Sequence, residues 1–172
     1  MSPERLWRFS AFLWRKGHKR LALAVKKLNS AIYHNSLPPD VQFSPDIHFG
    51  HHGFGTVIHS NVVIGRGVRI GHNVTIAVRA ATGTGPMIVI EDEAGIGAGS
   101  IVIAPRGRSI RIGRGARVGA GALVIADVPD GATAVSRPSR VIAAGAGGDA
   151  AAASDAALDE LAVGAAAESA VE

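Results

Sequence analysis

The stretch "IHSNVVIGRGVRIGHNVTI", residues 58–76, places an isoleucine at every sixth position. The same step returns in two later runs, and glycine or another small residue often follows the aliphatic one. The members of the three runs are Ile58, Ile64, Ile70 and Ile76; Ile90, Ile96 and Val102; and Ile112, Val118 and Val124. Neither the period of 3.6 that marks an α-helix nor the period of 2 that marks an ordinary strand fits these runs as well.

A period of six is typical of the parallel β-helix built from hexapeptides. Each hexapeptide forms a short strand and a turn, three hexapeptides close one coil, and the aliphatic residue stacks on its equivalent in the next coil. We therefore predict an all-β solenoid, a left-handed parallel β-helix, over residues 37–142. Two interruptions of the step, at 77–89 and 104–111, are predicted to be loops that project from one face.

The two flanks of this region differ from it in composition. Residues 1–36 carry apolar side chains at helical spacing, and residues 1–33 hold eight Lys or Arg against Glu4 alone, a net charge of +7. We predict a basic amphipathic helical segment that is broken at Gly17 and ended by Pro38 and Pro39. Residues 143–172 hold six Asp or Glu and no Lys or Arg, a net charge of −6, and this Ala-rich tail is predicted to be disordered.

Composition also excludes several classes of protein. The chain has no cysteine, which excludes disulfides and thiolate metal sites and favours a cytoplasmic location. No apolar run reaches the length of a membrane span, and charges throughout the N-terminal segment argue against a signal peptide. The basic segment lacks the motifs and the interleaved aromatic residues of nucleic-acid binders, so no nucleic-acid partner is expected.

The motifs within residues 37–142 resemble those of the hexapeptide-repeat acyltransferases, in the branch of the serine acetyltransferases and the sugar or polysaccharide O-acetyltransferases. The resemblance rests on four stretches, "HGFGTVIHSNVVIG", "TGTGP", "IGAGS" and "DVPDGATAVSRPSRVI". It implies transfer of an acetyl group from acetyl-CoA to a hydroxyl without a metal ion, in a homotrimer with active sites between subunits. In that chemistry a histidine acts as general base, and backbone N–H groups stabilise the oxyanion.

On this resemblance the general base is His52, because His52-Gly53-Phe54-Gly55 matches the family's His-x-x-Gly. His52 also lies six residues before Ile58, so we expect it in the aliphatic column; a hydrogen-bonded structural histidine is the alternative. His51 is expected to contact the acceptor, and Asp46 and Asp40 are the nearby candidates to orient the base. The positions that the resemblance assigns to acetyl-CoA are Gly83, Thr84, Gly85, Ala98, Ala120, Arg137 and Arg140.

A further group of basic residues is a candidate for the 3′-phosphate of CoA, for an anionic acceptor or for the acidic tail of a neighbouring chain. The group consists of Arg106, Arg108, Arg111, Arg114 and Arg117. Simple solvated charge is the alternative interpretation for Arg137 and Arg140.

Several positions depart from the pattern of the serine acetyltransferases. Those enzymes carry an aspartate where His51 lies, a second histidine where Gly85 lies, an orienting aspartate near Ser36 or Leu37, and a longer helical N-terminal domain. The departures favour a saccharide or glycan hydroxyl as acceptor, with a serine O-acetyltransferase or a catalytically inactive β-helix scaffold as alternatives. The helical segment, residues 3–34, is expected either to pack against the base of the β-helix or to contact the inner face of a membrane.

Overall fold

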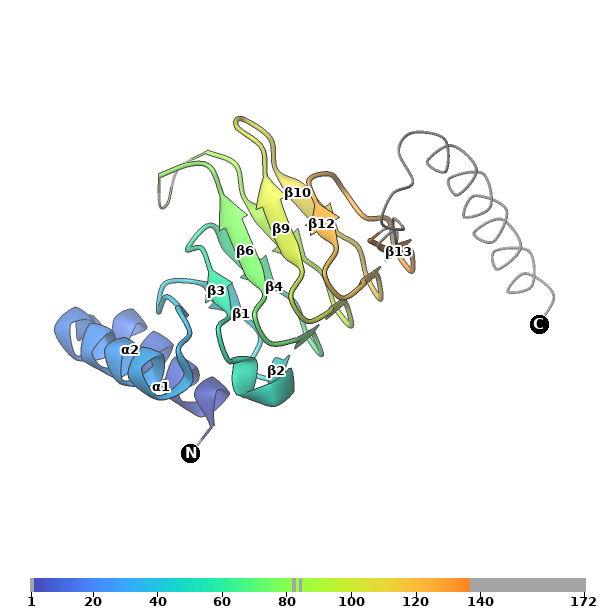
Figure 1. The fold of residues 1–172 in the computed structure, drawn as a ribbon. Coiled ribbons are helices and arrows are strands. Elements are labelled where there is room, and N and C mark those ends of the chain that lie inside the picture. The colour runs from blue at the N-terminus through green and yellow to red at the C-terminus, as the bar shows by residue number, and fades with distance from the viewer. Residues whose placement is uncertain (1, 82, 84, 137–172) are drawn as a thin grey trace, which may run out of the picture. The chain divides into compact units, whose positions relative to one another are not determined.

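The computed structural model describes residues 2–81, 83 and 85–136, which form two helices followed by stacked β-coils (Figure 1). Helix α1 spans Pro3–Arg15 and helix α2 spans Lys19–Tyr33. Pro3 lies in the first turn of α1, where its missing N–H has no helical partner to lose. Gly17 separates the helices with a φ of 85°, a left-handed conformation that glycine adopts readily. The predicted break of the helical segment is therefore confirmed.

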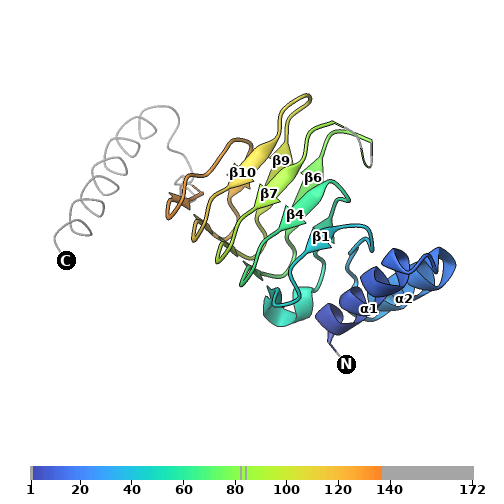
Figure 2. The same cartoon turned by 180° about the vertical axis from the view of Figure 1, so that it is seen from behind.

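The strands lie in three parallel sheets, and the coils visit the sheets in turn (Figures 1 and 2). Sheet A contains β3 (Val57–Ile58), β6 (Thr75–Val78), β9 (Ile101–Ala104) and β12 (Leu123–Val124). Sheet B contains β1 (Gln42–Phe43), β4 (Val62–Ile64), β7 (Ile88–Ile90) and β10 (Ile110–Ile112). Sheet C contains β2 (His48–Phe49), β5 (Arg69–Ile70), β8 (Gly95–Ile96), β11 (Arg117–Val118) and β13 (Thr133–Ala134).

The strand register confirms the six-residue column. Ile58 pairs with Ile76, Ile76 with Val102, and Ile96 with Val118, so each aliphatic residue stacks on its equivalent one coil away. All ten residues of the three runs are at most 5% exposed. Burying each Val or Ile side chain of this kind contributes roughly 1.5–3 kcal/mol, so these ten residues together contribute strongly to the stability of the β-helix.

The column begins earlier than predicted, and His52 does not belong to it. Leu37 and Phe49 are buried inward residues, and Phe49 pairs with Ile70. Nine residues separate Phe49 from Ile58 instead of six, because the 3₁₀ segment η1 (Gly50–Gly53) intervenes. Phe49 therefore fills the inward position that we expected for His52, whose side chain is exposed.

The two insertions leave the β-helix at the same edge, between sheet A and sheet B (Figure 1). They are shorter than predicted, at 79–87 and 105–109, because β6, β7, β9 and β10 extend into the ranges we expected to be loops. The buried side chain of Asn61 anchors the first insertion. Its Nδ2 donates hydrogen bonds to the carbonyl oxygens of Ala81 (3.2 Å) and Pro86 (3.3 Å), and its Oδ1 accepts one from the Gly83 N–H at 2.6 Å.

Helix α1 packs against the first coil, whereas α2 is mostly exposed. Trp7 is fully buried, its ring stacks on Phe43 with 3.9 Å between centroids, and its indole N–H donates a hydrogen bond to the Pro38 carbonyl oxygen at 2.7 Å. Glu4 accepts a hydrogen bond from the Phe49 N–H at 3.1 Å. In α2 only Ala22 and Asn29 are buried, so most of the apolar residues of this helix face solvent.

Candidate active site

The two candidate histidines lie in a left-handed turn at the edge where sheet C passes into sheet A. His51 has φ 48° and ψ 43°, His52 has φ 58° and ψ 20°, and Gly53 continues with φ 56°. Non-glycine residues seldom adopt this conformation, and each costs about 1 kcal/mol or more. Gly53 is needed here because a Cβ would lie 2.8 Å from the ring of Phe49. A strained turn of this kind is more typical of a functional site than of a simple connection.

Contacts with α2 and with the second coil hold this turn in place. The ring of His52 lies beside Tyr33, at the end of α2, with 5.9 Å between ring centroids. The ring of His51 meets the edge of the His72 ring at 5.0 Å between centroids. Within the described ranges the Nδ1 of His72 is buried without a hydrogen-bond partner. This contact between His72 and His51 was not predicted from the sequence.

The acid expected to orient the base lies elsewhere. Asp46 accepts a hydrogen bond from the Gly67 N–H at 3.0 Å, at the edge between sheets B and C. A hydrogen bond from Ser44, followed by backbone N–H bonds, lowers the pKa of Asp46. In the part of the chain that the structure describes, no carboxylate hydrogen-bonds to His51 or His52. Asp40 instead accepts a hydrogen bond from the Ser60 hydroxyl at 2.9 Å.

The turns that follow sheet C stack directly on the histidine turn. The Asn73 N–H donates to the Phe54 carbonyl (2.7 Å), the Gly99 N–H to the His72 carbonyl (2.9 Å), and the Gly121 N–H to the Ala98 carbonyl (2.9 Å). This ladder of turns includes both alanines predicted to bind acetyl-CoA, Ala98 and Ala120. The structure therefore brings His51, His52, Ala98 and Ala120 to one edge of the β-helix.

The glycine loop predicted to bind acetyl-CoA lies at the opposite edge of sheet A. Gly83 and Gly85 belong to the insertion after β6, which ends at the edge between sheets A and B. The four residues of β6 alone span roughly 13 Å, so within one chain the loop does not meet the histidine turn. Thr84, Arg137 and Arg140 lie outside the described residues.

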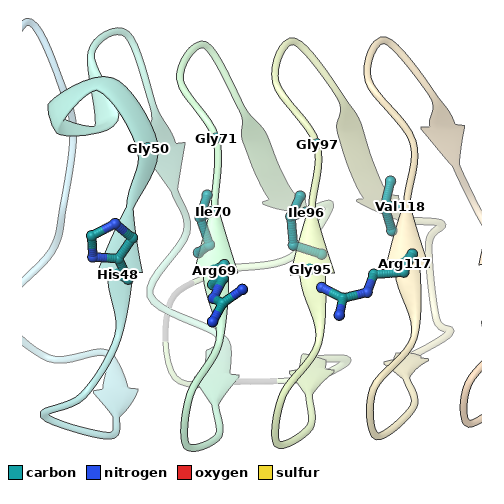
Figure 3. A pocket seen from close by; sticks show the side chains of 10 residues that line it. All are labelled: His48, Gly50, Arg69, Ile70, Gly71, Gly95, Ile96, Gly97, Arg117 and Val118. Carbon is teal, nitrogen blue, oxygen red and sulfur yellow. The ribbon is translucent and has the colours of Figure 1, made fainter.

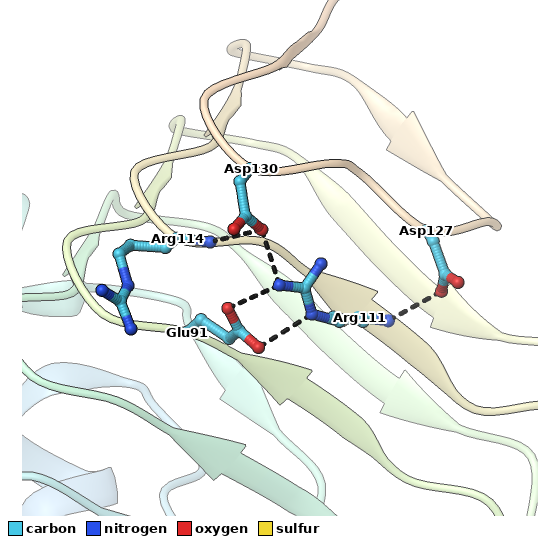
Figure 4. A network of polar contacts seen from close by, with 5 residues as sticks. All are labelled: Glu91, Arg111, Arg114, Asp127 and Asp130. Carbon is cyan, nitrogen blue, oxygen red and sulfur yellow. Dashed lines mark hydrogen bonds and ion pairs between the residues drawn. The ribbon is translucent and has the colours of Figure 1, made fainter.

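The structure divides the basic group between faces. Arg111, on the outer face of sheet B, donates from Nε and Nη2 to the two oxygens of Glu91 at 2.8 Å each, and from Nη2 to Asp130 at 2.6 Å (Figure 4). These bonds, with Glu91 the larger cause, raise the pKa of the Arg111 guanidinium. Arg117 lies six residues further on, on the face of sheet C. Arg111 is therefore neutralised within the chain, and Arg117 belongs to a different surface.

The described ranges contain neither a metal site nor a membrane-spanning helix. No cluster of three or more His, Cys, Asp or Glu side chains is arranged to hold a metal ion. Neither α1 nor α2 combines the length and the apolar character that crossing a bilayer requires.

Comparison with known proteins relates this β-helix to serine acetyltransferases. The chain is 33% identical over 136 residues to serine acetyltransferase 2 of Arabidopsis thaliana, covering 79% of this chain and 41% of that protein. It is 29% identical over 136 residues to the serine acetyltransferase of Escherichia coli K12, covering 79% and 48%. No family model matches the chain. The chain thus spans less than half the length of these relatives.

Solved structures show the same relationship. Soybean serine acetyltransferase complexed with serine has a TM-score of 0.68 at 35% identity, covering 80% of this chain and 54% of that chain. The Brucella abortus enzyme in complex with coenzyme A has a TM-score of 0.68 at 25% identity, covering 80% and 53%. These likenesses confirm the predicted left-handed parallel β-helix and the resemblance to the serine acetyltransferase branch. They lend no support to the predicted saccharide acceptor.

Proposed function

Because this chain resembles serine acetyltransferases over about four-fifths of its length, its β-helix included, we propose that it is an acetyl-CoA-dependent O-acetyltransferase whose acceptor is the hydroxyl of serine. The observation that supports the proposal is the likeness to serine acetyltransferases, together with a histidine turn that lies at the same edge of the β-helix as the turns at Ala98 and Ala120. The serine acceptor, rather than the saccharide that the sequence favoured, follows from relatives that are serine acetyltransferases and include a serine-bound structure.

In the proposed reaction His52 removes the proton from the acceptor hydroxyl, and the oxygen attacks the thioester carbonyl of acetyl-CoA. The tetrahedral intermediate collapses with loss of the CoA thiolate, which takes the proton back from His52. The products are the O-acetyl ester and CoA. His51, adjacent and exposed, is positioned to contact the acceptor. Because the Gly83 N–H already donates to Asn61, the oxyanion would be stabilised by a backbone N–H from another part of this loop, such as that of Gly85.

The histidine turn and the glycine loop can form one active site only if the site is shared between two chains. For that reason we propose a homotrimer. The histidine turn and the glycine loop lie at opposite edges of sheet A. The outer face between them is apolar: Val57 is 43% exposed, Leu123 63% and Ile125 56%. Packing this face against a second copy would bury it and bring one chain's loop to its neighbour's histidine turn, in an interface that can close into a ring.

Release of free thiol from acetyl-CoA tests the proposed activity. The chain is incubated with acetyl-CoA alone, with L-serine, and with a panel of sugars. We expect acceptor-dependent release with serine. Release with sugars only would refute the serine acceptor, and saturable acetyl-CoA binding without release for any acceptor would favour the inactive scaffold.

Substitution of the two histidines separately tests the base. His52→Ala should lower kcat by about 10²–10⁴-fold, whereas His51→Ala should act mainly on the KM for serine. Full activity of His52→Ala would contradict the assignment. Leu123→Glu, which places a charge on the apolar face of sheet A, should convert the trimer to monomers in light scattering and abolish activity; a trimeric variant would contradict the proposed interface.

We also propose that the α1–α2 hairpin contacts an anionic membrane surface. In α2, Leu21, Leu28 and Ile32 form a stripe at helical spacing, and they are 53%, 47% and 46% exposed. The same hairpin, within residues 1–33, also carries eight Lys or Arg side chains. A basic helix with an exposed apolar stripe suits the interface of an anionic bilayer. Self-association of the hairpin would instead place two segments of charge +7 against each other, which disfavours it.

Co-sedimentation with vesicles tests this contact. Vesicles with and without anionic lipid are compared for the unaltered chain, for Leu21→Gln/Leu28→Gln, and for Val135→Gln as a control at an exposed position after β13. Point changes are preferable to deletion of residues 1–34, because deletion would uncover the coil under Trp7. Loss of binding only in the double variant supports the contact, and equal binding by all three contradicts it.

A further inference from the structure

The outer face of sheet C carries a groove of about 360 Å³ that runs across four successive coils (Figure 3). Its floor is made of glycine backbone and its polar side chains are basic. The residues that define it here are His48, Arg69, Gly71, Gly95, Gly97 and Arg117. The groove lies on a different face from the apolar surface of sheet A that the proposed trimer would bury.

Two arginines of this groove lie on either side of one glycine. The strand register pairs Arg69 with Gly95 and Gly95 with Arg117, so the arginines lie on the two strands that flank β8. Figure 3 shows the guanidinium of Arg117 extended from β11 toward β8. A Cβ on Gly95 would lie 2.6 Å from Nη1 of Arg117. Because Gly95 has no side chain, the Arg117 guanidinium can occupy the space above it. A side chain at position 95 would displace the guanidinium.

These two arginines lack carboxylate partners, unlike Arg66 and Arg111 of the same β-helix. Arg66 is paired with Asp92 at 2.8 Å, and Arg111 with Glu91 and Asp130. Across residues 2–81, 83 and 85–136, by contrast, no hydrogen bond or ion pair involves the side chain of Arg69 or Arg117. Strands in a sheet are about 4.8 Å apart, so roughly 10 Å separates their Cα atoms, and two unpaired cations share a narrow strip of surface.

We propose that this groove binds a phosphate group between Arg69 and Arg117, over Gly95. The guanidinium fork presents several N–H donors that match phosphate oxygens, and two such forks on opposite sides of one group complement a dianion. The bare backbone of Gly95 gives the Arg117 guanidinium room to lie over β8, on the side that faces Arg69. His48, the register partner of Arg69, places an imidazole ring beside the site. The phosphate belongs either to a free metabolite or to the CoA molecule of the proposed reaction, and the binding itself does not depend on that reaction.

Calorimetric titration with inorganic pyrophosphate tests the site, at about 0.15 M salt so that unspecific attraction between exposed charges is screened. We expect saturable binding by the unaltered chain and at least a tenfold loss of affinity in Arg69→Gln/Arg117→Gln. Gly95→Ala should also weaken binding several-fold with both arginines retained, because the added methyl displaces the Arg117 guanidinium. Circular dichroism checks that each variant is folded.

Arg106→Gln is the matched control, because it removes one exposed positive charge from the 105–109 loop at a different edge. Its affinity for pyrophosphate should change less than twofold. The proposal is overturned if the unaltered chain shows no saturable binding, or if Arg106→Gln weakens binding as much as the double variant Arg69→Gln/Arg117→Gln does.

Competition between ligands identifies the carrier of the phosphate. If CoA displaces pyrophosphate and dephospho-CoA does so more weakly, the groove holds the 3′-phosphate of CoA. If neither displaces it, the groove serves a separate phosphate-bearing metabolite. Because pyrophosphate binding is measured without turnover, its failure and the failure of the acetyl-transfer proposal give different results.

Discussion

The close stacking of the turns at the edge between sheets C and A predicts a strong difference between two equivalent glycines. Gly97 and Gly119 occupy the same turn position in successive coils, and neither has a positive φ, so alanine suits both backbones. A Cβ on Gly97 would lie 2.5 Å from the Ala120 nitrogen, 2.7 Å from the Gly119 carbonyl carbon and 2.7 Å from the Val118 oxygen. On Gly119 the nearest atom, the Ala134 oxygen, would be 3.2 Å away.

The size of the effect follows from which atoms obstruct the methyl group. All three obstructing atoms at Gly97 are backbone atoms of the next coil, which is tied to this one by the 2.7 Å hydrogen bond from the Gly97 N–H to the Val118 oxygen. Overpacking costs typically 1–3 kcal/mol, and we expect about 3 kcal/mol for Gly97→Ala because backbone cannot rotate away. For Gly119→Ala we expect a change within about 1 kcal/mol, since the lower entropy of the unfolded chain offsets slight crowding.

Urea denaturation followed by far-ultraviolet circular dichroism measures this difference, with all proteins at one concentration because assembly would couple to stability. The free energy of unfolding of Gly97→Ala should fall about 3 kcal/mol below that of the unaltered chain, at an unchanged slope. Equal destabilisation by both variants would refute the reasoning, because it would show that the contact with the next coil is not what distinguishes the two positions.

Three further changes test other parts of the structure. The backbone N–H of Arg66, followed by its side chain, lowers the pKa of Asp92. The stability that the Asp92 carboxylate contributes should therefore be complete above its unfolded pKa of about 3.9 and should disappear as pH falls through its folded pKa. The urea midpoints of Asp92→Asn and of the unaltered chain should accordingly converge as pH falls below about 4. Asn61→Ala should raise the KM for acetyl-CoA in the thiol-release assay, with a stability loss of about 1–3 kcal/mol, because it frees the loop that carries Gly83. Ile76→Ala should cost about 2–5 kcal/mol in the same denaturation experiment, and a cost below 1 kcal/mol would contradict its place in the core.

The core of the β-helix could be predicted from the sequence because the inward positions must be aliphatic. That requirement produces an aliphatic residue at every sixth position, which is visible in the sequence. The same step also contained the signal that would have corrected the position of His52. Leu37, Phe43 and Phe49 follow each other at intervals of six, and counting forward from Phe49 shows that three extra residues precede Ile58. Counting backward from Ile58 placed His52 in the column, because a left-handed turn leaves no aliphatic mark in the sequence.

The outward positions could not be predicted in the same way, because solvent imposes no periodic residue type on them. Arg111 and Arg117 look like one basic group in the sequence, but a separation of six moves a side chain to the next face of the β-helix. Arg69 and Arg117 are 48 residues apart in the sequence. They lie on one sheet face, on the two coils that flank β8, because the two insertions between them leave the strand register unchanged. His72 was missed for a related reason, since its contact with His51 joins two different coils.

The position of both insertions at one edge has a consequence for how such a chain can change. The segments 79–87 and 105–109 leave and re-enter without altering which side chains face inward, as the continuous pairing of Ile64 with Ile90 and of Ile90 with Ile112 shows. Length can therefore vary there at little thermodynamic cost. Mutation could therefore lengthen a loop at this edge into a recognition segment without changing the coils. For the same reason a foreign peptide could be grafted at 105–109 while the strand pairing is preserved.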